Sequence, residues 1–387
     1  MGYGIMDQGL LTQEELRTAY SSRTDPDEAA RELIGQFGAV DAGAVLFFAS
    51  PSIAAAPIAR ALVERFPAVP VIGCTSAGEF TERGTATGGV SAVVLPRAIA
   101  PRAAGALARL DAGVDTGIAA AIADVEGQLQ LSLRDADPGR YIGLLLVDGL
   151  HGSEERVNEV LGNLAPLLSF VGGSAGDDLK FAKTEVFFGD ASSDHGAVLL
   201  VLDVAVPFTV VKTCSFEPTG TSFTITEADV PNRIVWELDD RPAVEVYAEA
   251  VQRTVDTLDA SVFMAHPFGL MIDGEPWIRS PQQVIEGRGV KFYCQILPGM
   301  DVDLMRPTDL IGETRAVMRN AVADLGDAVS GAVIFNCILR RLEIDDKNWN
   351  DDFVGAIGGI RAAGFHTYGE SWLGHINQTL TAVVFGR

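Results

Sequence analysis

The stretch Gly73-Cys74-Thr75-Ser76-Ala77-Gly78-Glu79 is the first of three copies of one short signature. Each copy follows an apolar run and contains a glycine, small or hydroxyl residues, a second glycine and a carboxylate. The other copies are Gly173-Ser174-Ala175-Gly176-Asp177 and Gly364-Phe365-His366-Thr367-Tyr368-Gly369-Glu370. Glycines let the backbone approach a bound molecule, and hydroxyls and carboxylates can hold it. The signature therefore suggests a binding site made by repetition.

The sequence around each signature repeats as well. A β-rich run and a helix-like stretch come before it, and a second apolar run follows it. The β-rich runs are 44–49, 141–147 and 332–338, and the later runs are 90–95, 197–202 and 380–385. The offset between the first two copies is 98 residues, both from Leu46 to Leu144 and from Ser76 to Ser174. This agreement predicts that 41–95 and 141–202 share one strand–helix–strand–turn–strand unit, with 331–386 as a more distant third copy.

These repeats predict an α/β protein of two packed halves, each with a mixed sheet flanked by helices. We expect a polar N-terminal arm at 1–24, an N-terminal half at 25–205 and a C-terminal half at 206–387, because β-rich segments replace the repeat after Pro207. Within the second copy, 184–188 and 197–202 are interpreted as a hairpin around a polar turn. Arg340 and Arg341 are interpreted as the end of a strand, and 351–362 as a helix.

Composition excludes several classes of partner. The 387 residues are 48% apolar, enough for a large core, and 29 basic against 52 acidic residues give a formal charge of −23. Nucleic acid and anionic membranes need a positive surface, so neither is an expected partner. No apolar run approaches the roughly 20 residues of a membrane span, and the first eleven residues lack the basic region of a secretory signal. With four scattered cysteines, mostly in apolar runs, we expect a cytoplasmic protein with reduced thiols.

Six blocks in order give the chain a resemblance to a known family. They are 71–79, 170–178, Glu237-Leu238-Asp239-Asp240-Arg241-Pro242-Ala243, 334–341, 364–370 and Asn377-Gln378-Thr379-Leu380. In this order they resemble the FIST sensory module, with its N-terminal and C-terminal halves. The resemblance spans about residues 25 to 387. It departs from the family at His366, where another aromatic residue is usual.

The resemblance implies a ligand-binding sensor in signal transduction. FIST modules are proposed to sense small molecules such as amino acids, and some bacterial members resemble haem-based nitric-oxide sensors. Related domains occur in eukaryotic F-box proteins. The chain has no room for a kinase, cyclase, chemoreceptor or F-box domain, so we expect a separate signalling protein to carry the output. The oligomeric state stays open.

The three signature carboxylates, Glu79, Asp177 and Glu370, indicate which ligand suits these turns. They make poor phosphate cradles, and the lysine of a P-loop is missing. A carboxylate beside free backbone N–H groups suits a zwitterion, because the carboxylate binds an ammonium and the N–H groups bind a carboxylate. An amino-acid-like ligand is therefore expected. The alternative is that the glycines only permit tight turns, with Ser76, Ser174 and Thr367 as caps.

The predicted ligand-binding residues come from all three signatures and their flanks. They are Cys74, Thr75, Ser76, Glu79, Ser174, Asp177, Arg340, His366, Thr367, Tyr368, Glu370 and Asn377. Arg340 is included because arginine grips a carboxylate well, although a salt-bridged strand end is the alternative. Cys74 is interpreted as a small buried thiol. An enzyme using Cys74, Glu79 or Glu370 is the competing hypothesis, and it needs a base within reach.

The five histidines lack metal-ligand spacing, so no metal or cofactor is expected. His366 and His375 flank the third signature. Neutral, hydrogen-bonded histidines are the favoured interpretation, and haem ligation in a gas sensor is the alternative.

Overall fold

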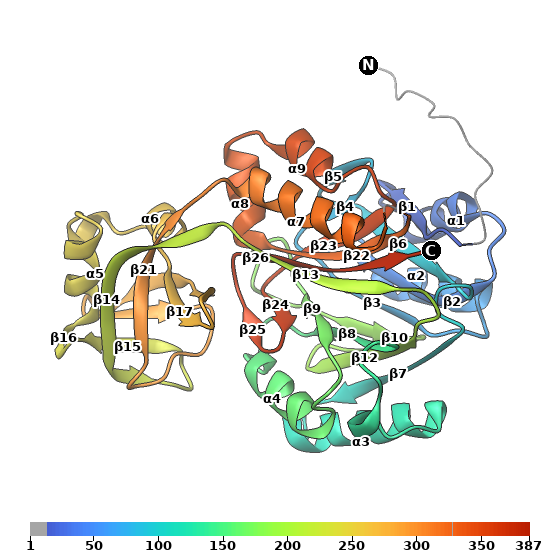
Figure 1. Cartoon of the computed structure of the whole chain (residues 1–387), viewed down its shortest axis with the longest axis horizontal. Helices are drawn as coiled ribbons and strands as arrows, with labels where there is room; N and C mark the ends of the chain where they lie inside the picture. Colours follow the sequence, from blue (N-terminus) through green and yellow to red (C-terminus); the bar gives the residue numbers. More distant parts are fainter. Residues whose placement is uncertain (1–13, 327) are drawn as a thin grey trace.

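A computed structural model describes residues 14–326 and 328–387, whose strands form four sheets (Figure 1). Three six-stranded sheets build a core, and an eight-stranded sheet belongs to a separate inserted domain. Helices flank the core on its outside, with α7, α8 and α9 at the top of Figure 1 and α3 and α4 at the bottom. The predicted α/β class is confirmed. None of the helices in these described ranges is long and apolar enough to cross a membrane.

Three modules of similar topology make the core. The first comprises β2 (Ala42–Ala49), α2 (Ala55–Arg65), β3 (Val71–Thr75), β4 (Glu79–Thr81), β5 (Gly84–Ala86) and β6 (Val90–Pro96). The second comprises β8 (Tyr141–Val147), α4 (Glu154–Leu164), β9 (Phe170–Ser174), β10 (Val186–Phe188), β11 (Ala191–Ser193) and β12 (Gly196–Asp203). The third comprises β22 (Val329–Cys337), α8 (Ile338–Asp346), α9 (Asn350–Ala356), β23 (Ala362–Thr367), β24 (Glu370–Trp372), β25 (His375–Ile376) and β26 (Thr379–Gly386).

The three core sheets have the same strand order. In each, an edge strand is followed by the last, first and second long strands of one module, and then by a short hairpin from another module. The edge strands are β1 (Arg17–Ser21), β7 (Arg102–Arg109) and β13 (Phe208–Cys214). The first two long strands are parallel and the third is antiparallel in every case. The repeat predicted from the sequence is therefore confirmed in its strand order.

The modules exchange their hairpins in a cycle. Hairpin β4–β5 of the first module pairs with β23 of the third, β10–β11 of the second with β3 of the first, and β24–β25 of the third with β9 of the second. The predicted hairpin of 184–188 with 197–202 is therefore wrong. β10 pairs with β11 and β3, while β12 lies in another sheet between β7 and β8. This exchange makes each core sheet depend on two modules.

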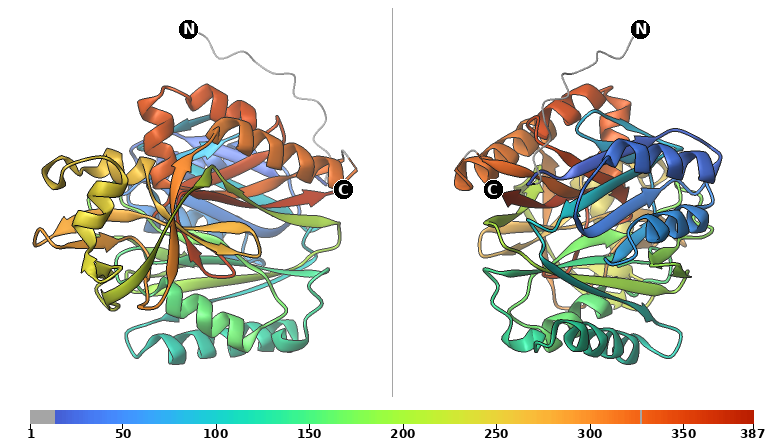
Figure 2. Two further views of the ribbon diagram at one scale, coloured as in Figure 1. Left: turned by 60° about the vertical axis from the view of Figure 1, so that its left-hand side comes forward. Right: turned by 90° about the vertical axis from the view of Figure 1, so that its right-hand side faces the viewer.

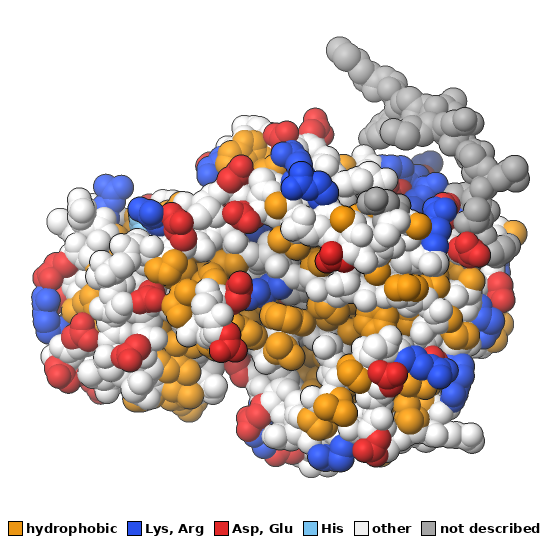
Figure 3. All heavy atoms as spheres, in the orientation of Figure 1, with side chains coloured by type: hydrophobic (Ala, Val, Ile, Leu, Met, Phe, Trp, Pro, Cys, Tyr) orange, Lys and Arg blue, Asp and Glu red, His pale blue; other side chains and the backbone are white. Residues whose placement is uncertain are grey.

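The long strands are buried on both faces, which explains their continuous apolar sequences. In β2, Val45 and Phe47 pack toward the helices, and Leu46 and Phe48 pack toward the middle of the molecule. There the three sheets share one core, in which the ring of Phe48 stacks on Phe365 at 4.6 Å. Hydrophobic side chains also gather on the face shown in Figure 3, over the middle of the core.

The remaining core elements are helices and one short turn. They are α1 (Pro26–Phe37), α3 (Val114–Leu129), the 3₁₀ turn Leu133–Asp135 and α7 (Leu310–Asp324). Asp25 caps α1 by accepting a hydrogen bond from Glu28 N–H at 2.9 Å. The first strand, β1, lies within the predicted polar arm and pairs with β6, and residues 1–13 of that arm lie outside the described ranges.

The inserted domain lies between β13 and α7. It stands to the left of the core in Figure 1 and lies behind the core in the right-hand view of Figure 2. Its strands are β14 (Phe216–Asp229), β15 (Ile234–Leu238), β16 (Arg241–Pro242), β17 (Phe268–Ile272), β18 (Glu275–Arg279), β19 (Pro281–Ile285), β20 (Gly289–Phe292) and β21 (Asp301–Pro307). Its helices are α5 (Ala243–Ala250), the 3₁₀ turn Val255–Thr257 and α6 (Ala260–Ala265). The chain enters through β14 and leaves through β21, which pair with each other.

Three local predictions need correction. Arg340 and Arg341 lie in α8 rather than on a strand, because β22 ends at Cys337 and the helix begins directly afterwards. The helix predicted over 351–362 ends at Ala356, and Ala362 already begins β23. The third correction concerns alignment. Thr75 faces Ala49 in the parallel ladder and Ser174 faces Val147 in its counterpart, so Ser174 corresponds to Thr75 rather than to Ser76.

Candidate cleft between the core and the inserted domain

The three signatures contact one another through their backbones. Ala77 N–H donates to the His366 carbonyl at 3.0 Å, Gly176 N–H to the Thr75 carbonyl at 3.0 Å, and Tyr368 N–H to the Ser174 carbonyl at 3.1 Å. Each module thus donates one hydrogen bond to the next and accepts one from the other. The packing is close, since a Cβ on Gly176 would lie 2.7 Å from the Cβ of Ala77. The backbone N–H groups of this ring bind the protein itself.

Two signature carboxylates are turned inward and fully buried. Glu79 accepts hydrogen bonds from the Ser76 hydroxyl and, at 3.1 Å, from Gly89 N–H. Glu370 accepts them from the Thr367 hydroxyl and, at 2.6 Å, from the Thr379 hydroxyl. Desolvation raises the pKa of each carboxyl to about 8. Both residues close the turn of their own signature.

The third carboxylate, Asp177, organises a loop. It accepts hydrogen bonds from the N–H groups of Phe181 at 2.9 Å, Ala182 at 2.6 Å and Lys183 at 3.0 Å, and from the Tyr368 hydroxyl. Desolvation acts to raise its pKa, but the Tyr368 hydroxyl and the three N–H groups together lower the pKa below its ordinary value. The charged carboxylate therefore holds the loop 177–183 in place.

A cleft of about 710 Å³ lies between the core and the inserted domain. Loops at the carboxyl ends of core strands form one wall, and the inserted domain forms the other. Its lining residues are Gly149, Leu150, His151, Gly152, Glu154, Leu179, Phe181, Pro231, Asn232, Arg233, Gln282, Gln283, Lys291, Phe292, Tyr293, Ile338, Leu339 and Tyr368. Carboxyl ends of strands in α/β proteins are common ligand sites, and this volume falls in the range of small-molecule pockets.

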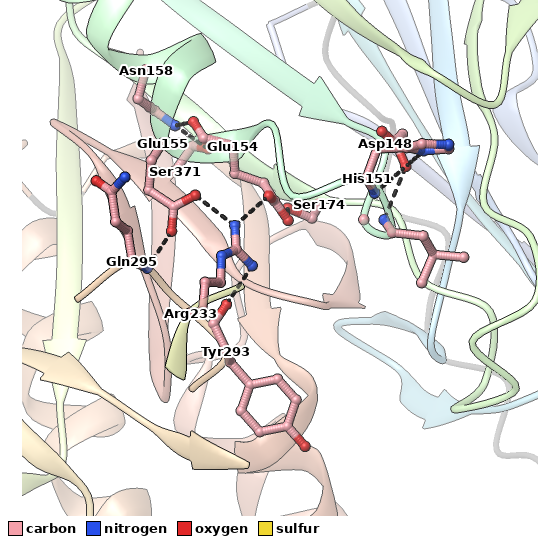
Figure 4. Close-up of polar contacts among 12 residues, drawn as sticks. Asp148, His151, Glu154, Glu155, Asn158, Ser174, Arg233, Tyr293, Gln295 and Ser371 are labelled. Atoms are coloured by element: carbon pink, nitrogen blue, oxygen red, sulfur yellow. Dashed lines mark hydrogen bonds and ion pairs between the residues drawn. The ribbon is translucent and has the colours of Figure 1, made fainter. Parts of the chain in front are cut away.

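An ion pair joins the two walls of the cleft (Figure 4). Arg233, from the inserted domain, donates through Nη2 to Glu154 at 2.9 Å and Glu155 at 2.5 Å, and through Nη1 to the Tyr293 carbonyl at 2.8 Å. Gln295 N–H donates to the second oxygen of Glu155 at 2.6 Å. Desolvation lowers the pKa of Arg233, but the two carboxylates outweigh it and raise the pKa above its ordinary value. The arginine therefore stays charged.

The cleft is lined by both apolar and polar side chains. The ring of Phe181 is stacked on Tyr368, with centroids 5.3 Å apart and planes at 27°. His151 Nδ1 lies 2.9 Å from Oδ1 of the buried Asp148 (Figure 4). The ring of His151 stacks on that of His195 at 4.3 Å. The side chain of Lys291 makes no hydrogen bond or ion pair with the described residues.

The predicted site residues are distributed unevenly around this cleft. Tyr368 lines it directly. Thr75 and Asp177 line a second cavity of about 430 Å³ on the other side of the loop 177–183, together with Ser52, Lys180, Lys183 and Glu185. The other predicted residues line neither cavity and are buried; they are Cys74, Ser76, Glu79, Ser174, Arg340, His366, Thr367, Glu370 and Asn377.

Arg340 and His366 have internal partners. Arg340 donates to Asn336 Oδ1 at 2.8 Å and to the Thr314 hydroxyl at 2.6 Å. The ring of His366 packs against Phe80 and Phe353, and its nitrogens lie 2.9 Å from Asn336 Nδ2 and 3.3 Å from the Thr85 hydroxyl. A haem iron needs a ring nitrogen that faces an open cavity, so the surroundings of His366 do not fit an axial ligand.

Sequence reasoning missed the cleft residues Glu154, Arg233 and Lys291. Glu154 was visible only as an acidic first turn of a helix, a role it also fulfils in α4. Arg233 and Lys291 come from a segment without a repeat, so no pattern singled them out. Glu154 and Arg233 are 79 residues apart, and only the placement of the inserted domain brings them together.

Comparison with family models matches residues 43–241 to the FIST N domain and residues 243–372 to the FIST C domain. The chain belongs to the FIST family. Comparison with curated proteins gives no match. FIST domains are small-ligand-sensing modules of signal transduction, so a sensory role holds for this FIST protein at that level. The two matches meet in the inserted domain at Pro242, the last residue of β16.

Proposed function

We propose that this FIST protein senses an amino-acid-like ligand that binds in the cleft between the core and the inserted domain. The observation that supports this most is the ion pair of Glu154 and Arg233 at the cleft. Lys291 lines the same cleft, and its side chain has no partner within 14–326 and 328–387. A zwitterion carries an ammonium and a carboxylate close together. Glu154 offers a carboxylate for the first, and Lys291 and Arg233 offer cations for the second.

Burial strengthens this recognition. The side chain of Glu154 is 3% exposed and that of Arg233 is 17% exposed, so charges brought against them are poorly screened by solvent. Glu370, one of the three carboxylates expected to bind the ammonium, lines neither cavity and accepts hydrogen bonds from two threonines. The zwitterion hypothesis therefore keeps its chemistry but moves to a different carboxylate.

A ligand that contacts both walls of the cleft can change the position of the inserted domain and so produce a signal. A ligand that contacts both Glu154 and Lys291 binds more tightly when the inserted domain lies close to the core, so it favours that arrangement. A separate signalling protein then reads the position of the inserted domain. The cleft is the place where ligand affinity and domain position are coupled.

Calorimetric titration with a panel of amino acids and biogenic amines tests the proposal. For an amino acid that binds, Glu154→Gln should weaken binding by about 2–5 kcal/mol, because a desolvated charge pair is lost. Glu159→Gln, on an exposed face of the same helix, is the matched control and should leave the affinity unchanged. An N-acetylated form of the same amino acid has no ammonium, so it should bind wild type and Glu154→Gln with similar affinity. Equal affinity of the free amino acid for both proteins would contradict the role of Glu154, and no binding by any panel member would contradict the proposal.

A further inference from the structure

Two large apolar side chains of one loop are exposed at the cleft. Phe181 is 51% exposed and Leu179 is 38% exposed, and both line the cleft. The loop that carries them, 177–183, separates this cleft from the second cavity. Exposed apolar side chains at a cleft are a common feature of ligand-binding surfaces.

The backbone holds these side chains there against its own preferences. Asp178, Leu179 and Phe181 have φ angles of 55°, 63° and 49°, a region that side chains of this size rarely adopt. Leu179 N–H donates to the Tyr368 hydroxyl at 2.7 Å, and the Asp177 carboxylate binds the N–H groups of Phe181, Ala182 and Lys183. Such backbone strain persists where the surroundings enforce it, often at ligand sites. The exposure of Phe181 is thus a consequence of specific contacts.

The ring of Phe181 lines the cleft and is partly covered. One side of the ring is stacked on Tyr368 with an angle of 27° between the planes, and half of the Phe181 surface remains exposed. A planar aromatic ring matches this geometry better than a branched aliphatic group, because offset stacking places the positive edge of one ring over the negative face of the other.

We propose that the ligand is an α-amino acid, or a close derivative, with a planar aromatic side chain that stacks on Phe181. This inference rests on the proposed function: the charged end of the ligand lies at Glu154 and Lys291, and its ring covers Phe181 and Leu179. The loop 177–183 then selects among amino acids by the shape of their side chains.

Matched probes separate planarity from hydrophobicity. Titration of the full-length protein with phenylalanine, cyclohexylalanine and leucine compares a planar ring, a puckered ring of similar size and a branched chain. Phenylalanine is expected to bind at least about tenfold more tightly than cyclohexylalanine or leucine, and tyrosine or tryptophan is expected to share this preference. Since this comparison uses the wild-type protein, it does not depend on whether a variant folds.

Variants of Phe181 supply the second measurement. Phe181→Leu should abolish the preference for phenylalanine over cyclohexylalanine, and Phe181→Trp should retain it. Leu167→Ala, which removes another exposed apolar side chain, is the control and should change neither affinity. If leucine and cyclohexylalanine bind wild type as tightly as phenylalanine, the aromatic inference is overturned while the proposed function stands. If none of these amino acids binds, the aromatic inference is overturned, and the proposed function is overturned as well only if no other member of the amino-acid and amine panel binds. A preference that survives Phe181→Leu removes Phe181 from the site.

Discussion

Glu79 and Glu370 occupy equivalent positions in the first and third modules, and each accepts a hydrogen bond from the hydroxyl three residues before it. Each also binds the backbone N–H that begins or precedes the last strand of its module, Gly89 in one and Thr379 in the other. In the second module Ala175 takes the place of that hydroxyl residue and Asp178 that of the carboxylate, while the neighbouring Asp177 binds the loop 177–183. The first and third modules thus use their carboxylates to hold their own turns, and the second module uses Asp177 to shape the wall of a cleft.

These buried carboxyls should make stability depend on pH. The pKa of Glu79 and of Glu370 is about 8 in the folded protein, against an ordinary value of 4.5. A raised pKa means that the folded protein binds a proton at this carboxyl more tightly than the unfolded chain does. Protonation therefore stabilises the fold, and this contribution is complete below about pH 4.5 and is lost as the pH rises through 8. Glu79→Gln should therefore gain stability relative to wild type between pH 5 and pH 8, by roughly 1.4 kcal/mol per unit of pKa shift that it removes.

Chemical denaturation at several pH values measures this difference. His366 acts in the opposite direction, because desolvation and the two neighbouring arginines lower its pKa, so the difference between variant and wild type is the informative quantity. The exposed Glu159→Gln should show no such trend. A constant difference between Glu79→Gln and wild type from pH 5 to pH 8 would contradict a raised pKa.

Gly176→Ala should destabilise the junction of the three signatures. The added Cβ would lie 2.7 Å from the Cβ of Ala77 and 2.8 Å from its nitrogen, so two modules must separate. Overpacking of this kind typically lowers the free energy of unfolding by about 1–3 kcal/mol. The control is Gly162→Ala in α4, where a Cβ meets nothing within 4 Å and helix propensity favours alanine by about 0.5–1 kcal/mol. Equal unfolding midpoints for wild type and Gly176→Ala would show that the junction is not closely packed.

Cys74→Ser should leave a folded protein that still binds its ligand. Cys74 is fully buried on β3, next to Phe48 and Val186 in the ladder, and desolvation raises the pKa of its thiol. A buried hydroxyl without a partner costs about 1–3 kcal/mol of unfolding free energy. Thermal unfolding and calorimetry test both statements. A variant with normal stability and no ligand binding would show that the thiol has a functional role.

Arg233→Met should lower the free energy of unfolding by more than the loss of one exposed charge would. It leaves the buried Glu154 without its partner, and breaking a buried pair in this way costs about 3–5 kcal/mol. The double variant Arg233→Met, Glu154→Gln should recover part of this loss. Arg288→Met, which removes half-exposed pairs with Glu227 and Glu237, should change stability by less than about 1 kcal/mol.

Denaturant unfolding, with amide hydrogen exchange in β15 and β20, locates the effect of Arg233→Met. Faster exchange in these strands is expected, because Arg233 lies at the start of β15 and ties the inserted domain to α4. Additive effects of Arg233→Met and Glu154→Gln would mean that the two residues do not interact energetically.

The repeated apolar runs predicted the strands of the core because their information is local. A strand such as Tyr141–Val147, buried on both faces, is a continuous apolar sequence wherever its neighbours come from. The alignment of Ser174 with Ser76 was off by one position, because an offset counted in residues does not register one extra residue between the strand and the signature. The hydroxyls and carboxylates of the signatures do form hydrogen bonds, but Glu79 and Glu370 bind groups of the protein itself.

By itself, the sequence determined the α/β class and the three modules, since these depend on periodicity, glycine positions and residue type. Only the tertiary structure decided which module receives each hairpin, because the N–H and C=O groups at the edge of a strand are the same in every sheet and do not name a partner. The tertiary structure also decided which residues meet at the cleft. Glu154 and Arg233 meet because the inserted domain folds back onto α4, and a contact across 79 residues leaves no periodic trace in one sequence.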